Sequence, residues 1–115
     1  MLLVPGLLLA QNLKKVDSLK TIAKTATGKA KFRALIFLSD QYSDNNLNES
    51  MRYANAALLM AKKVKNDSFI GLANNAVANI FQSKSQLDSA LFYHKKALAS
   101  NQKIKDATRM ADNYN

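Results

Sequence analysis

An internal repetition with a period of about 40 residues constrains the fold of this chain more than any other feature. Shifting the sequence by that distance lays Tyr53 on Tyr93, Ala57 on Ala97 and Leu58 on Leu98. It also lays the Lys-Val-Lys segment at 63–65 on the Lys-Ile-Lys segment at 103–105. Because the matches concentrate at positions where helices would pack, the sequence predicts a series of similar helical units.

The second unit shows the pattern most clearly. Its first half, from residue 71, carries apolar residues three or four apart, the spacing of an amphipathic helix: Leu72, Ala73, Ala76, Val77, Ile80 and Phe81. A polar break at 82–88 precedes a second helical pattern. Ala78, Ala90 and Ala97 stand where two helices would approach closely, with Phe81 and Tyr93 beside them. We therefore expect antiparallel pairs that meet at Ala78/Ala97 and, one unit earlier, at Leu38/Ala57.

A helix–turn–helix unit with this order of residues resembles a tetratricopeptide repeat. The likeness is carried by Ala78, Phe81, Ala90, Ala97 and Leu98, and the chain departs from the usual pattern at Asn74 and His94. The resemblance implies an all-α fold, an α-solenoid of antiparallel helix pairs that wind into a right-handed superhelix.

The chain also resembles the N-terminal repeat regions of Bacteroidetes-type sensor histidine kinases and helix-turn-helix regulators. Those regions begin with a signal and a short helix that contains a segment like Asp17-Ser18-Leu19. This resemblance implies a sensor or assembly module of a larger bacterial signalling protein, tethered to a membrane through regions that follow Asn115.

The domain organisation follows from the repeats and from the apolar start of the chain. Residues 1–10, MLLVPGLLLA, are too few to span a bilayer but match the apolar part of a secretory signal. The alternative is an apolar arm that packs on the first helix. A signal predicts an exported or periplasmic protein; without one, the chain is cytoplasmic. Residues 11–28 are expected to form a leading helix and turn, 29–66 and 67–105 two repeats, and 106–115 the start of a third.

The residues of enzyme active sites are scarce in this chain. It has no Cys and a single histidine, His94, for which we expect packing, with a functional role as the alternative. The eight acidic residues are scattered, and the three glycines form no phosphate-binding loop. We therefore expect no enzyme activity, no cofactor, no metal site and no small-molecule substrate.

A stripe of polar residues offers the best candidate for binding. Asn75 and Asn79 are four residues apart, and Gln82 and Ser83 follow one turn later, so all four project along one helix face. The resemblance places such a face on a concave groove, where an Asn amide can both donate to and accept from a peptide backbone. The predicted groove consists of Arg33, Ile36, Asp40, Leu72, Asn75, Asn79 and Gln82. Ile36 and Asp40 replace the Lys and Asn with which chaperone-binding members clamp a carboxylate, and a solvated helix face is the alternative.

The chain is strongly basic, with 17 Lys and Arg against 8 Asp and Glu and a formal charge of +9. A nucleic-acid-binding surface would interleave aromatic residues and Arg with these bases. Only Phe32 and Tyr93 lie near them in sequence, both at core-type positions. The main prediction is therefore a non-catalytic protein-binding module with a protein or peptide partner and no nucleic acid. A basic helical nucleic-acid-binding protein in the cytoplasm is the alternative, and an acidic protein partner also fits the charge.

Overall fold

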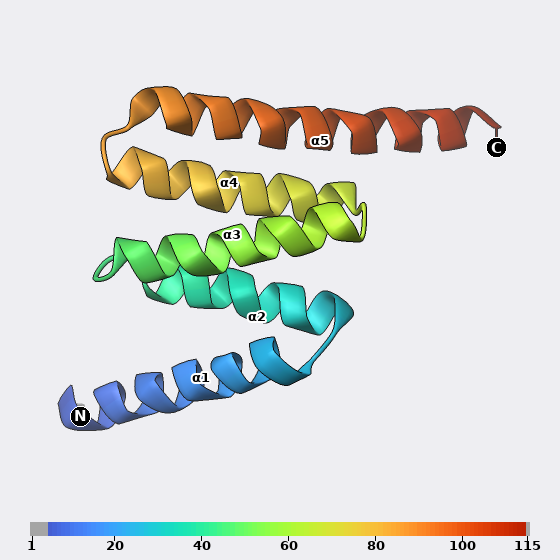
Figure 1. Ribbon diagram of the computed structural model, residues 1–115. Helices are drawn as coiled ribbons and strands as arrows, with labels where there is room; N and C mark the ends of the chain where they lie inside the picture. Colours follow the sequence, from blue (N-terminus) through green and yellow to red (C-terminus); the bar gives the residue numbers. More distant parts are fainter. Residues whose placement is uncertain (1–4, 115) are drawn as a thin grey trace.

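Over its described residues, the chain folds into five α-helices that pack on one another in sequence order (Figure 1). The computed structural model describes the backbone of residues 5–114 and the side chains of residues 11–112. The helices are α1 (Pro5–Thr25), α2 (Gly28–Gln41), α3 (Leu47–Lys63), α4 (Asp67–Ser83) and α5 (Leu87–Tyr114). The described residues hold no strand, so the predicted all-α fold is confirmed.

Two of the turns are built in the same way. After α3, Lys65 has a left-handed backbone (φ 56°), and after α4, Ser85 does (φ 59°). In the first turn the Asn66 amide donates to the Ala61 carbonyl at 3.2 Å. In the second, the Gln86 amide donates to the Phe81 carbonyl at 2.9 Å. These bonds satisfy carbonyl groups that the end of a helix leaves free, and they reverse the chain within three residues.

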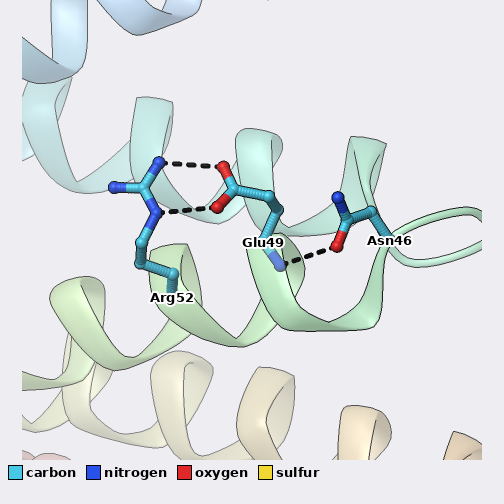
Figure 2. Close-up of polar contacts among 3 residues, drawn as sticks. All are labelled: Asn46, Glu49 and Arg52. Atoms are coloured by element: carbon cyan, nitrogen blue, oxygen red, sulfur yellow. Dashed lines mark hydrogen bonds and ion pairs between the residues drawn. The ribbon is translucent and has the colours of Figure 1, made fainter.

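Asparagine side chains begin the two helices that carry most of the core. The Asn46 Oδ1 atom accepts a hydrogen bond from the Glu49 amide at 3.1 Å (Figure 2). The Asn66 Oδ1 atom likewise accepts from the Phe69 amide at 3.0 Å, at the start of the next helix. Such caps satisfy one of the free amides at a helix start and fix where α3 and α4 begin.

Stacked aromatic rings join the helices of each pair. Tyr42 stacks on Tyr53 between the end of α2 and α3, with ring centroids 5.9 Å apart. Phe81 stacks on Tyr93 between α4 and α5, with centroids 5.5 Å apart. The two pairs occupy matching positions of the repeat, so the sequence periodicity corresponds to a repeated contact in space.

The core lies along α3, which packs on both α2 and α4. Four small residues of α3, Ser50, Ala54, Ala57 and Ala61, are completely buried, and the larger Tyr53 and Leu58 of the same helix also belong to the core. Because Ser50 and the three alanines have small side chains, α2 and α4 also contact each other. Phe32 and Phe69 stack across that contact, with centroids 4.1 Å apart.

The predicted contacts at Ala78/Ala97 and Leu38/Ala57 stay predictions, and they are compatible with the neighbouring aromatic stacks. A Cβ atom at Gly71 would lie 3.7 Å from the Ala97 carbonyl oxygen, so Ala97 sits beside the start of α4. Phe81 stacks on Tyr93 in the same antiparallel pair, and Ala78 lies three residues before Phe81 while Ala97 lies four residues after Tyr93. Both alanines are buried, as expected. Leu38 and Ala57 are both completely buried, and Tyr42 stacks on Tyr53 four residues from each of them.

The expected boundary between residues 105 and 106 is not a turn. Helix α5 continues without a break to Tyr114, and its last turns extend beyond the start of α4 (Figure 1). The segment at 103–105 therefore stays helical, whereas its sequence equivalent at 63–65 leads into a turn. Helix α3 packs on α2 and α4, whereas α5 packs on α4 alone among the described helices.

The leading helix is longer than predicted, because α1 begins at Pro5 and not near residue 12. In α1, Val16, Leu19 and Ala23 pack against the core, while Leu13 and Ile22 remain exposed. The predicted signal or arm at 1–10 lies partly outside the described residues, and its export role stays a prediction. Over the described chain, each helix is too short or too polar to cross a bilayer.

Replacing Ser85 by glycine should stabilise the protein. The left-handed conformation of Ser85 places its Cβ atom close to backbone oxygen, and glycine removes that strain. We expect the free energy of unfolding to rise by about 1 kcal/mol, measured by urea denaturation. The control Ala99→Gly, at an exposed position inside α5, should instead lower it by about 1 kcal/mol, because glycine is a poor helix former. A loss of stability in both variants would contradict the turn geometry.

Replacing Ala97 by phenylalanine should overpack the contact between α4 and α5. Ala97 is 4% exposed, so a large ring has no room without moving one helix. The expected loss is roughly 1–3 kcal/mol of unfolding free energy. The matched control is Ala107→Phe, at an exposed position of the same helix, which should unfold at the urea concentration of the parent. An unchanged midpoint for Ala97→Phe would show that the helices do not meet there.

Candidate functional site

A groove crosses the molecule between α2 and α4, and we call it the polar groove. Its volume is about 270 Å³, and Ile36, Ser39, Asp40, Ser43, Ser50, Leu72, Asn75, Ala76, Asn79, Ile80 and Ser83 line it. Five of the seven predicted groove residues are in this set: Ile36, Asp40, Leu72, Asn75 and Asn79. The other two, Arg33 and Gln82, are exposed but do not line it.

The floor of the polar groove is closed by two hydroxyl groups. The Ser50 hydroxyl donates to the Ser39 carbonyl at 2.6 Å, and the two side-chain oxygens are 3.3 Å apart. Both serines are buried, so these bonds satisfy polar atoms that water does not reach. Serine is small enough at both positions for α2 and α3 to meet below the groove.

The rim combines amides with one large apolar side chain. Asn75 and Asn79 project from α4 and are exposed, which fits the predicted stripe. Leu72, one turn before Asn75, is 55% exposed and offers an apolar contact next to them. Ser83 continues the stripe in place of Gln82, and its hydroxyl donates to the Asn79 carbonyl at 3.1 Å. The groove therefore presents hydrogen-bonding groups beside apolar surface.

His94 is a part of this region that sequence reasoning missed. Its Nδ1 atom lies 2.9 Å from the Asn75 Oδ1 atom, and the ring is half-buried. The contact orients the Asn75 amide, because an imidazole N–H that donates to Oδ1 leaves the amide N–H groups free to face a ligand. The prediction of packing for His94 is compatible with this contact. Its partner could not be found without the register of α5 on α4.

The charge of the polar groove differs from that of the whole chain. Among the described residues that line it, Asp40 alone is charged, although the chain carries +9. The carboxylate is exposed at the end of α2. A ligand in this groove therefore meets a neutral surface with one negative group.

A second hollow lies between α1, α2 and α3, and we call it the basic hollow. Its volume is about 920 Å³. Its described lining includes five cationic side chains, Lys20, Lys24, Lys31, Arg52 and Lys63, and no acidic one. Apolar residues share the lining: Ala23, Leu35, Ala56, Leu59, Met60 and Val64.

Two of these cations have local partners. Arg52 forms two hydrogen bonds to the Glu49 carboxylate, at 3.0 and 2.9 Å (Figure 2). The guanidinium group lowers the pKa of Glu49, and the carboxylate in turn raises the pKa of Arg52. Lys20 lies over the Tyr42 ring at 5.7 Å, and interaction with the Tyr42 side chain raises the pKa of Lys20. Both cations therefore remain charged at neutral pH and are held at the rim.

The described residues contain no cluster of His, Asp and Glu that could hold a metal ion. Searches with protein-family models, among curated proteins and among solved structures gave no match for this chain.

Removal of the Arg52 guanidinium should raise the pKa of Glu49. Its hydrogen bonds favour the charged carboxylate, so Arg52→Gln should return the pKa of Glu49 towards its ordinary value. Stability gained from this pair is present above that value and is lost as the pH falls through the lowered pKa. An NMR titration of the Glu49 carboxyl carbon measures the change. Arg109→Gln, in the last turns of α5, should leave the titration unaltered; an equal shift in both variants would contradict the pairing.

Proposed function

We propose that this chain is a non-catalytic protein-binding module whose polar groove holds an extended segment of a partner protein. The carrying observation is that Asn75 and Asn79, with Leu72 beside them, line one groove together with Ile36 and Asp40. The two amides are exposed and supply donors and acceptors that a peptide backbone needs.

The spacing of the amides supports an extended ligand. Residues four apart on a helix are displaced by about 6 Å along its axis. Alternate residues of an extended chain are about 6.6 Å apart and face the same way. Asn75 and Asn79 can therefore bind alternate peptide groups of one segment, while Leu72 and Ile36 contact side chains between them. Recognition of this kind depends on the backbone and tolerates varied sequences.

The charge of the polar groove indicates which kind of peptide segment it can bind. Asp40 would attract a basic side chain and would repel an acidic one. We therefore propose a neutral or basic segment for the polar groove. The carboxylate clamp of chaperone-binding tetratricopeptide repeats would need cations here, and the described lining of the groove has none.

The repeated contacts support the proposal that the polar groove belongs to an α-solenoid. The matching aromatic stacks and matching turns are those expected of an α-solenoid built from tetratricopeptide-like repeats. In this proposal α2 and α4 are the first helices of two successive repeats, and the polar groove is on the concave side. A role as the sensor or assembly region of an exported bacterial signalling protein is part of the same proposal.

Removal of the two amides should weaken binding without affecting the fold. Segments that bind can be selected from a library of random peptides displayed on phage, with the full chain as the target. For a selected peptide, the double variant Asn75→Ala with Asn79→Ala should lose tenfold or more in affinity, since each hydrogen bond contributes about 0.5–1.5 kcal/mol. Isothermal titration calorimetry measures the affinity, and thermal unfolding should stay near that of the parent.

The matched control replaces two exposed asparagines of α3, Asn48 and Asn55, by alanine. It should bind the peptide as the parent does. Selection of no peptide, or equal affinity in the Asn75/Asn79 variant, would contradict the proposed function. Preference for acidic peptides at this groove would contradict the role given to Asp40.

A further inference from the structure

The basic hollow combines exposed apolar side chains with cationic ones on one surface. Leu59 is 72% exposed and Val64 is 54% exposed, and both line the hollow together with Lys24 and Lys63. An exposed leucine costs free energy in water, because transfer of its apolar surface out of water is favourable. Clustered lysines repel one another at the same time.

Only part of this charge is neutralised within the protein. Among the described residues, the ion pair at the rim is Arg52 with Glu49, at 2.9 Å. Lys24, Lys31 and Lys63 have no ion pair within the described part of the chain. The hollow is therefore left with positive charge next to apolar surface, in a volume too large for a single inorganic anion.

We propose that the basic hollow docks an acidic amphipathic segment of a partner protein. Carboxylates of the segment would approach Lys24, Lys31 and Lys63, and its apolar side chains would cover Leu59 and Val64. Charge complementarity selects this partner, since the described lining holds five cations and no acid. A nucleic acid would use the charges but would leave the two exposed apolar side chains uncovered.

This site is independent of the polar groove. The polar groove lies between α2 and α4 and carries one carboxylate, whereas the basic hollow is bounded by α1 and α3. Segments of opposite charge are expected at the two places. The Asn75→Ala with Asn79→Ala variant should therefore bind an acidic segment as tightly as the parent.

A designed peptide tests the proposal directly. The probe is a fluorescein-labelled amphipathic peptide with leucines at helical spacing and glutamates on either side of them. Its affinity for the full chain is measured by fluorescence anisotropy at low and at physiological salt. We expect binding that weakens as salt is added, because screening reduces exposed charge interactions. A peptide with glutamine in place of every glutamate should bind at least tenfold more weakly.

Two matched pairs of variants locate the contact. Charge reversal of Lys24→Glu with Lys63→Glu should reduce affinity at least tenfold, and Lys95→Glu with Lys103→Glu, on α5, should reduce it much less. Leu59→Gln should also weaken binding severalfold, whereas Leu98→Gln should not, although both leucines are about equally exposed (72% and 67%). The four lysines are all exposed, so folding should be retained, and circular dichroism checks it.

Several results would overturn the proposal. Equal losses in the two lysine variants would show that overall charge, not the basic hollow, attracts the peptide. Equal affinity for the glutamine peptide would remove the role of the cations. Binding to phosphatidylglycerol vesicles or to duplex DNA, with no binding of the acidic peptide, would assign the hollow to a membrane surface or to a nucleic acid.

Discussion

The packing of the helices depends on small side chains along one face of α3. Ser50, Ala54, Ala57 and Ala61 are spaced by three or four residues and are completely buried. Small side chains let helix backbones approach closely, so α3 can pack on α2 and α4 together. Had these positions held leucine, α2 and α4 would be too far apart for Phe32 to stack on Phe69. One face of one helix thus sets the distance between two others.

The polar groove is a consequence of that distance. It lies where α2 and α4 run side by side above α3, and the hydroxyl pair of Ser39 and Ser50 closes its floor. The basic hollow arises differently. Over the described residues, helix α1 packs on α2 but not on α3, which leaves the space between α1 and α3 open. The two hollows therefore differ in shape and charge because one follows from close packing and the other from a missing contact.

Sequence reasoning predicted the helices and named five residues that line one hollow, and its errors have identifiable causes. Asn75 and Asn79 were identified because helical spacing fixes which residues share a face. Gln82 and Ser83 differ by one position, and spacing alone could not decide which continues the stripe; the structure selects Ser83. Arg33 does not line the groove. It follows Phe32, which stacks on Phe69, and this stack lies one turn before the first groove residues, Ile36 and Leu72. His94 was missed because its partner depends on the register of two helices, which no local pattern contains.

Sequence periodicity predicted burial least well, because the burial of a residue depends on which helices surround it. Leu58 and Leu98 occupy matching repeat positions, yet Leu58 is 6% exposed and Leu98 is 67% exposed. Helix α3 lies between two others, while α5 contacts α4 alone within the described chain.

Asn74 shows the converse case, because it is a polar residue with 2% exposure. Its amide donates to the Ile70 carbonyl, and its Oδ1 atom has no partner among the described residues. An unpaired buried oxygen costs about 1–3 kcal/mol, so the close packing of α4 on α5 must outweigh it. The repeat thus predicts which residues can be buried, and the number of helices packed around each position determines which of them are buried.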